Sequence, residues 1–281
     1  MVEAPVTLAE RAAAFAVGMP SARAFSHLTA ARLLGLPLPS GLAHEADTGP
    51  LHVMACTDDG QVRREGCVGH RGLEIRATTL LDGVRVVDPA HTWVDVGELR
   101  RGRLTVDDLV VLGDAAVARI DNASGQQVRS GAHTSAGTRA LHTALHGRVR
   151  PRGKVMLAQA LETVRPRVRS PMETRARLMF VHAGFPEPEV GGVIVDDAGE
   201  FLAEGDLVWR SERVVAEYQG AHHAEIARRS ADTGRRHLLE GHGWRVRELF
   251  AEDVYRAPRR RNTLEVVAVM LGLDLATLFI T

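Results

Sequence analysis

The second half of the chain alternates between helix-like and strand-like segments in an order that few folds accommodate. Apolar periodicity predicts helices over residues 171–184, 223–241 and 262–271, and strands over residues 189–196, 201–209, 213–219 and 244–249. A helix, three strands, a helix, a strand and a helix fit a mixed sheet with helices packed against it. We therefore expect an α/β fold in which this sheet forms the second of two domains.

The first half predicts an α+β domain with shorter elements. Its pattern favours helices over residues 7–18, 26–34, 89–96 and 106–119, and strands over residues 51–56, 62–69, 73–76 and 84–87. A turn signal at residues 57–60 predicts that the first two strands form a hairpin. Cys56 and Cys67 would then lie at opposite ends of that hairpin, so we expect no disulfide between them.

Composition bears on where the protein works and what it binds. The absence of a paired disulfide fits a reducing cytoplasm. The start of the chain does not read as a signal peptide, and the apolar run 266–273 is too short to span a bilayer, so we expect no membrane partner. The formal net charge is zero, so contacts with nucleic acid must come from local basic patches.

One such patch separates the two halves. Residues 148–169 contain seven cationic side chains and only one acid, Glu162. We expect a solvated basic linker here, and the alternative is a strap along a phosphate backbone. The predicted division is an N-terminal domain over 1–147, the linker over 148–169 and a C-terminal domain over 170–281.

Three acids of the C-terminal domain stand where acids are costly to bury. Asp206 and Glu217 interrupt two neighbouring strand-like runs, and Glu173 lies on the preceding helix. A hairpin would bring Asp206 and Glu217 to one sheet edge, where Glu173 can join them. Several converging carboxylates suit Mg²⁺ or Mn²⁺, which polarises oxygen and lowers the pKa of bound water. Gln219 follows Glu217 by two residues and shares its strand face.

This pattern resembles the PD-(D/E)xK nuclease superfamily, in which an acid precedes an acid-x-lysine pair. Glu173, Asp206 and the segment 217–219 occupy the three motif positions in the right element order. The resemblance implies a restriction-endonuclease-like mixed sheet flanked by helices. It also implies a metal-dependent DNA endonuclease, acting in repair or phage defence, with Glu173, Asp206 and Glu217 as metal ligands.

More narrowly, residues 170–255 are similar to very-short-patch-repair endonucleases. The matching pieces are Glu217-Tyr218-Gln219-Gly220, then His223, a helix with basic residues, and Gly243-Trp244-Arg245-Val246-Arg247. The resemblance implies a hydrolytic role for His223, with His222 as the fallback. It also implies phosphate contacts by four arginines of the helix, and the alternative is that they pair with neighbouring acids on an exposed face: Arg228, Arg229, Arg235 and Arg236.

Gln219 departs from the superfamily pattern, where lysine is usual. Glutamine carries no charge and only orients a water or bonds a phosphate, and His223 is then the remaining candidate base. Residues 20–118 contain the stretches Phe25-Ser26-His27-Leu28-Thr29-Ala30-Ala31, Leu34-Gly35-Leu36-Pro37, Leu51-His52-Val53, Gly69-His70-Arg71 and Val87-Asp88-Pro89-Ala90-His91-Thr92-Trp93-Val94-Asp95. With these stretches the region resembles, more loosely, an AbiEi-type antitoxin and regulator. The alternative to an endonuclease is therefore a catalytically inactive DNA-binding regulator or antitoxin with a cognate toxin protein as partner. Retention of all three acids favours the enzyme, and Gln219 favours the regulator.

Overall fold

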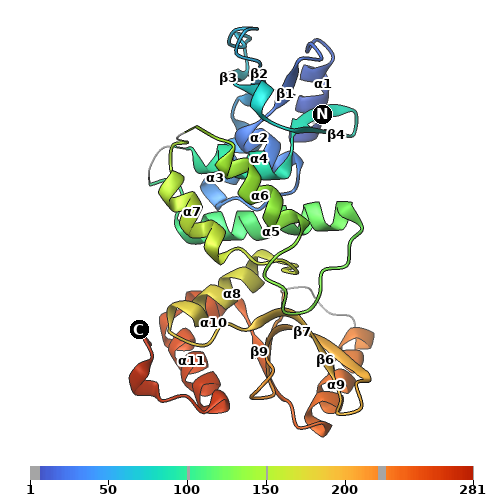
Figure 1. The fold of residues 1–281 in the computed structure, drawn as a ribbon, viewed down its shortest axis with the longest axis vertical. Coiled ribbons are helices and arrows are strands. Elements are labelled where there is room, and N and C mark those ends of the chain that lie inside the picture. The colour runs from blue at the N-terminus through green and yellow to red at the C-terminus, as the bar shows by residue number, and fades with distance from the viewer. Residues whose placement is uncertain (1–6, 100–101, 150, 221–225, 281) are drawn as a thin grey trace, which may run out of the picture. The chain divides into compact units, whose positions relative to one another are not determined.

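A computed structural model describes residues 7–99, 102–149, 151–220 and 226–280, except for the side chains of residues 226–233. The chain divides into two compact units, Met1–Gln126 with Thr134–Pro166, and Gln127–His133 with Arg167–Thr281. The described residues form eleven α-helices and two mixed sheets. Figure 1 traces these elements along the chain from blue to red. The prediction of an α/β fold is thereby confirmed.

The sheet of the first unit has five short strands. These are β1 (Arg23–Phe25), β2 (Leu51–Ala55), β3 (Cys67–Arg71), β4 (Thr78–Leu81) and β5 (Val84–Val87), arranged in the order β3-β2-β1-β5-β4. β4 and β5 form an antiparallel pair, whereas β1 runs parallel to β5 and β2 runs parallel to β3.

The predicted hairpin over residues 51–69 is wrong, because β2 and β3 are parallel with Leu51 opposite Cys67. Residues 56–66 instead carry the chain back to the start of β2, where Leu51 N–H bonds to the Gly66 carbonyl at 2.9 Å. Val62, the apolar residue that suggested a strand, is buried within this return segment. Cys56 and Cys67 are free thiols.

The strand predicted over residues 73–76 is also wrong, because Leu73–Ile75 form a short 3₁₀ helix. Gly72 precedes it with a φ of 98°, a left-handed conformation that glycine adopts readily and that interrupts an extended chain. Leu73 is buried through this turn, so the apolar residues that indicated a strand serve a compact turn.

Seven helices complete the first unit. They are α1 (Leu8–Ala16), α2 (His27–Leu33), α3 (Ser40–Thr48), α4 (Pro89–Gly97), α5 (Val106–Ser124), α6 (Ala136–His146) and α7 (Lys154–Thr163). Thr105 and Asp108 form a reciprocal capping box at the start of α5. α7 lies inside the segment expected to be a basic linker, and it buries Leu157 and Ala160 completely.

The sheet of the second unit has four strands in the order β6-β7-β8-β9. They are β6 (Glu189–Val195), β7 (Phe201–Trp209), β8 (Val214–Tyr218) and β9 (Arg245–Leu249). β6, β7 and β8 are antiparallel, and β9 runs parallel to β8. The helices are α8 (Pro171–His182), α9 (Ile226–Gly241), α10 (Ala251–Tyr255) and α11 (Ala257–Leu271). The predicted elements follow one another in the expected order, but the short helix α10 was not predicted and α11 begins five residues earlier than expected.

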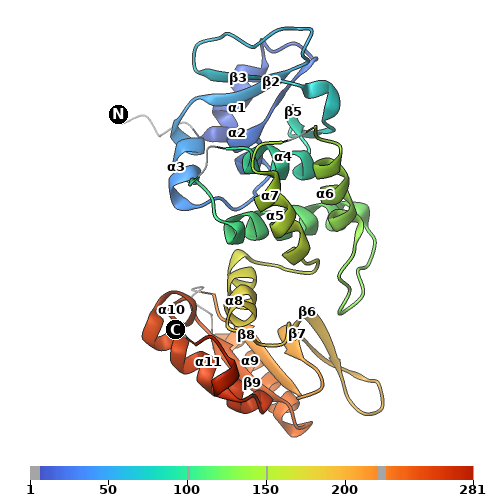
Figure 2. The same ribbon diagram turned by 60° about the vertical axis from the view of Figure 1, so that its left-hand side comes forward.

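Helices cover both faces of this second sheet, as Figure 2 shows. On one face, α8 and α11 pack through Phe180 and Val267 against Leu207 and Ala216. On the other face, Val208 and Val215 pack with Leu239 of α9 and with Trp244. The sheet thus lies between two helical layers, with Asp206 inside β7, Glu217 near the end of β8 and Glu173 on α8.

Across the described residues, we find no helix with both the length and the apolar composition that a bilayer crossing requires.

Candidate functional site

Glu173 is placed by the start of α8. Ser170 caps this helix by accepting a hydrogen bond from Glu173 N–H at 3.2 Å, and Pro171 occupies the first helical position. The Glu173 side chain turns back, and its Oε2 accepts a hydrogen bond from Arg169 N–H at 2.9 Å. Glu173 is only 8% exposed. It therefore combines a helix-capping role with a buried negative charge.

Asp206 lies on β7 and is tied to the next strand. Its Oδ2 accepts a hydrogen bond from the backbone N–H of Tyr218 at 2.8 Å. The β7–β8 register pairs Leu207 with Ala216, so the next step along the ladder brings Asp206 level with Glu217. The structure thus places these two acids opposite each other on neighbouring strands, so the predicted approach of Asp206 to Glu217 is found.

Burial acts on both of these carboxylates. Burial raises the pKa of Glu173, and the nearby charge of Asp206 raises it further. Burial also raises the pKa of Asp206, although the Tyr218 hydrogen bond and the charges of Arg235 and Arg169 oppose that shift. Burial and mutual repulsion disfavour the charged forms of these two neighbouring acids. A bound cation would favour the charged forms of both.

Glu217 is held differently, because it forms an ion pair with Arg235 of α9. Its side chain is 14% exposed, and that of Arg235 is 39% exposed. Strand alternation puts Glu217 on the face of Val215, which packs with α9. The guanidinium of Arg235 also acts electrostatically on Asp206, so Arg235 links the two strand acids.

Gln219 follows the end of β8. Its backbone N–H bonds to the Leu249 carbonyl at 2.7 Å, which extends the pairing with β9 by one residue. Its side chain is half-buried. His223 and its fallback His222 lie outside the described residues, as do the side chains of Arg228 and Arg229. Their predicted roles stay predictions.

Arg236 has acidic neighbours on the exposed side of the unit. Its Nε bonds to Glu240 at 2.8 Å, one helical turn further along α9, and its Nη1 lies 3.9 Å from Glu248. The two described arginines of this helix, Arg235 and Arg236, therefore both pair with acids of the same unit. The Arg236 pairs are exposed on both sides, and exposed pairs of this kind exchange partners at little energetic cost.

Sequence reasoning missed three neighbours of the acids. Arg167 and Arg169, which were assigned to the linker, both form ion pairs with Glu204 of β7. Arg169 is largely exposed, and its charge opposes the rise in the pKa of both Glu173 and Asp206 without cancelling it. Glu204 precedes Asp206 by two residues, so strand alternation was the signal that would have found it.

The donor set fits an oxygen-liganded cation that keeps much of its water. The backbone hydrogen bonds occupy one oxygen each of Glu173 and Asp206, which leaves the second oxygen of each as a ligand. Among the residues that the structure describes, Glu173, Asp206 and Glu217 do not form a trio with donor atoms all within 4.8 Å. Mg²⁺ is commonly bound by one or two carboxylates together with waters and substrate phosphates.

A separate histidine cluster in the first unit was not predicted. His27 begins α2, His52 lies on β2 and His70 lies on β3, and one ring nitrogen of each lies within 4.8 Å of the others. Burial lowers the pKa of all three imidazoles, to about 3 for His27 and to about 4 for His70. Histidines within apolar elements were the available signal, but their convergence depends on strand pairing.

Known proteins resemble this chain only in part. No family model matches it, and no solved structure matches it. Two curated proteins from strains of Mycobacterium tuberculosis, both named only as uncharacterized, are each 31% identical to it over 176 residues. The match covers 61% of this chain and 57% of each relative, so the chain spans little more than half the length of the curated relatives it matches.

Proposed function

We propose that the second unit hydrolyses phosphodiester bonds of DNA with Mg²⁺ or Mn²⁺ at Glu173, Asp206 and Glu217. The observation that carries this proposal is the shared burial of Glu173 and Asp206. Both are acids with raised pKa values, and the charge of Asp206 contributes to the shift of Glu173. Two buried carboxylates near each other lower the stability of the folded state unless a positive charge compensates them. A binding role for the pair explains why the fold keeps them there.

The ion would neutralise phosphate charge and lower the pKa of a bound water. Asp206 and Glu173 would hold it through their second carboxylate oxygens, and Glu217 would join them when Arg235 turns to a phosphate. Arg169 and Arg235 stand beside the acids and suit the bidentate recognition of phosphate. Gln219 would orient a water or a phosphate oxygen, and His223 is the candidate base.

The experiment is a plasmid-nicking assay on the full chain with Mg²⁺, Mn²⁺ or EDTA. We expect metal-dependent nicking that Asp206→Ala reduces by at least about 100-fold, the scale of a lost catalytic group. The matched control is Asp197→Ala, since Asp197 belongs to the same unit and its side chain is 90% exposed. Equal activity in Asp206→Ala and Asp197→Ala would refute the site assignment.

The second candidate function is a DNA-binding regulator or antitoxin that holds DNA or a toxin without cutting. The ion pair between Arg235 and Glu217 favours it, because a guanidinium there already neutralises one of the three acids. Salt-dependent DNA binding without nicking in any metal would support this candidate over the enzyme. Either activity is proposed for a cytoplasmic protein.

A further inference from the structure

The histidine cluster of the first unit is assembled from three elements that are distant along the chain. His52 Nδ1 lies 3.0 Å from His70 Nε2. The His27 ring stacks on the His70 ring, with centroids 3.7 Å apart and planes 18° apart. Since β2 and β3 pair with Met54 opposite His70, His52 and His70 share one face of the sheet. The cluster therefore depends on the parallel pairing of β2 with β3.

Two hydrogen bonds to buried residues at the start of α2 fix the backbone of His52. The Thr29 hydroxyl accepts a hydrogen bond from His52 N–H at 2.8 Å, and Ser26 N–H bonds to the His52 carbonyl at 3.0 Å. Ser26 and Thr29 are both fully buried. These bonds join the first turn of α2 directly to β2, so His27 and His52 are held in a fixed relationship.

His27 itself has a strained backbone. Its φ is 48°, in the left-handed region that residues other than glycine seldom adopt. Such conformations persist where the surroundings require them, and they concentrate at ligand-binding sites. Here the strained residue is the one whose imidazole stacks on that of His70.

The hydrogen-bond pattern leaves the right atoms available for an ion. His27 Nδ1 lies 3.0 Å from the Ser26 hydroxyl, which leaves Nε2 as its ligand atom. The 3.0 Å contact between His52 and His70 needs a proton on one of the two nitrogens, and a cation would replace that proton. Tetrahedral zinc with Zn–N bonds of about 2.0–2.1 Å sets ligand nitrogens roughly 3.4 Å apart. The His52 and His70 nitrogens lie 3.0 Å apart and those of the trio all lie within 4.8 Å, so that spacing requires side-chain adjustment of the trio.

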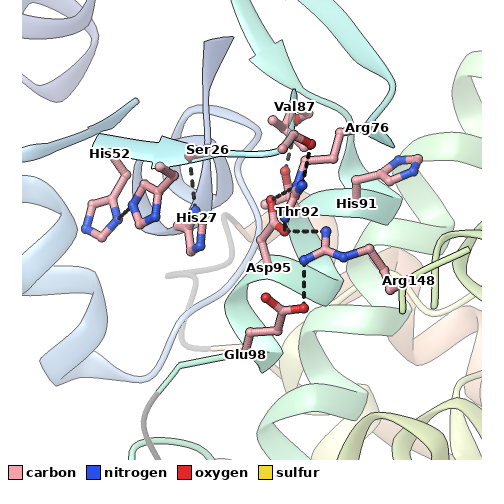
Figure 3. Close-up of polar contacts among 12 residues, drawn as sticks. Ser26, His27, His52, Arg76, Val87, His91, Thr92, Asp95, Glu98 and Arg148 are labelled. Carbon is pink, nitrogen blue, oxygen red and sulfur yellow. Dashed lines mark hydrogen bonds and ion pairs between the residues drawn. The ribbon is translucent and has the colours of Figure 1, made fainter. Parts of the chain in front are cut away.

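Charged groups lie around the cluster. Asp95 is fully buried and acts electrostatically on His27 and His70, while Glu45 acts on His52. Figure 3 shows Asp95 between the histidines and Arg148. Asp95 accepts hydrogen bonds from Arg76 and Arg148, and Arg148 also bonds to Glu98 at 2.6 Å. This network fixes one negative charge beside the imidazoles without using it as a ligand.

We propose that His27, His52 and His70 bind one Zn²⁺ or similar transition-metal ion, with the fourth position open to water or an anion. Three imidazoles suit zinc and not Mg²⁺, which prefers oxygen ligands. Within the described residues, no fourth His, Cys, Asp or Glu joins the trio at the same spacing. Three protein ligands with an open position are the arrangement of catalytic rather than structural zinc sites.

The experiment measures metal binding directly. The full chain is stripped with EDTA and titrated with Co²⁺ and Zn²⁺ in excess Mg²⁺, which occupies oxygen-ligand sites without competing for imidazoles. We expect one Co²⁺ per chain with the visible absorption of a tetrahedral complex, displaced by one Zn²⁺. Azide should change this spectrum, because it enters the open position.

Variants locate the ion. His52→Gln should weaken Zn²⁺ binding by at least about 100-fold, since loss of outer partners alone costs about 10–100-fold. The matched control is the double variant His142→Gln/His146→Gln, which removes an exposed, stacked pair one helical turn apart on α6. His70→Cys should keep the metal and add a Co²⁺–thiolate charge-transfer band, a readout that a merely structural histidine would not produce.

Circular dichroism of the metal-free variants checks that each one folds. Absence of saturable binding at one ion per chain, or binding lost in the His142/His146 control and retained in His52→Gln, would overturn the proposal. The result is independent of the nuclease proposal, because Asp206→Ala should leave Zn²⁺ binding unchanged.

Discussion

The backbone N–H of Tyr218 donates a 2.8 Å hydrogen bond to Oδ2 of Asp206, which joins β7 to the end of β8 beside Glu217. This bond opposes the effect of burial on the Asp206 pKa, but the pKa still lies above its ordinary value. The second unit therefore holds a carboxylate in a place that disfavours its charge. Such an arrangement is expected at a binding site, where a protein keeps a functional group although that group lowers the stability of the fold.

Asp206→Asn should stabilise the second unit at neutral pH, by on the order of 1 kcal/mol, because it removes a buried charge while the amide oxygen can still accept from Tyr218. The raised pKa means that the native state binds more protons than the unfolded state between the ordinary and the raised value. Stability therefore falls as pH rises through that window.

Hydrogen exchange of β7 and β8 in metal-free buffer, measured from pH 7 downward, tests this prediction. The stabilisation by asparagine should shrink as the pH approaches the ordinary carboxylate pKa. Asp197→Asn, at a side chain that is 90% exposed, should show no such gain. An Asp206→Asn variant that is less stable than the wild type at pH 7 would mean that the charge is compensated within the protein.

Arg235→Gln should weaken DNA binding and reduce the slope of log K against log salt by about 0.9, the contribution of one phosphate contact. The unfolding free energy should change by less than about 1 kcal/mol, because the Arg235 side chain is 39% exposed. Fluorescence anisotropy with duplex DNA at several salt concentrations provides the measurement. Arg213→Gln, at a comparably exposed arginine paired with Asp197, is the control, and an equal slope in both variants would exclude a role for Arg235.

Arg148→Ala should destabilise the first unit by about 3 kcal/mol, because it leaves the buried charge of Asp95 and the half-buried charge of Glu98 with fewer partners. Arg103→Ala, which breaks the more exposed pair with Glu45, should lose at most about 1 kcal/mol. Urea unfolding compares the two variants. A similar small loss in both would show that Arg148 belongs to a solvated basic segment, as the sequence first suggested.

Acid should destabilise the metal-free first unit between pH 6.5 and about 4 through His70, because burial lowers its pKa from 6.5 to about 4. In that window the unfolded state binds the proton and the native state does not, so stability rises with pH by up to about 1.4 kcal/mol per pH unit for this histidine. His70→Gln should flatten the dependence of unfolding free energy on pH by that amount. The exposed His142→Gln should leave it unchanged, and an equal pH dependence in wild type and His70→Gln would contradict the assignment.

Local patterns were sufficient for most of the second unit. Apolar alternation over residues 201–209 and 213–219 marks β7 and β8, and the acids that interrupt it fall within β7 and near the end of β8. Asp206 and Glu217 come together because antiparallel neighbours in sequence are also neighbours in space. The partners that modify them, Arg235 and Arg169, were not predicted as such, since they approach from outside the two strands.

Sequence by itself determined the α/β class, the element order of the second unit apart from α10, and the placement of Glu173 on a helix and of Asp206 and Glu217 on neighbouring strands. Each of these depends on contacts that are short-range along the chain. Tertiary structure alone decided that β2 and β3 run parallel, that α7 packs within the first unit, and that His27, His52 and His70 converge. Those features depend on pairings between segments that carry no mark of their partners. Strand direction and register are set by the packing of the whole sheet, and no local sequence pattern encodes the direction or the register.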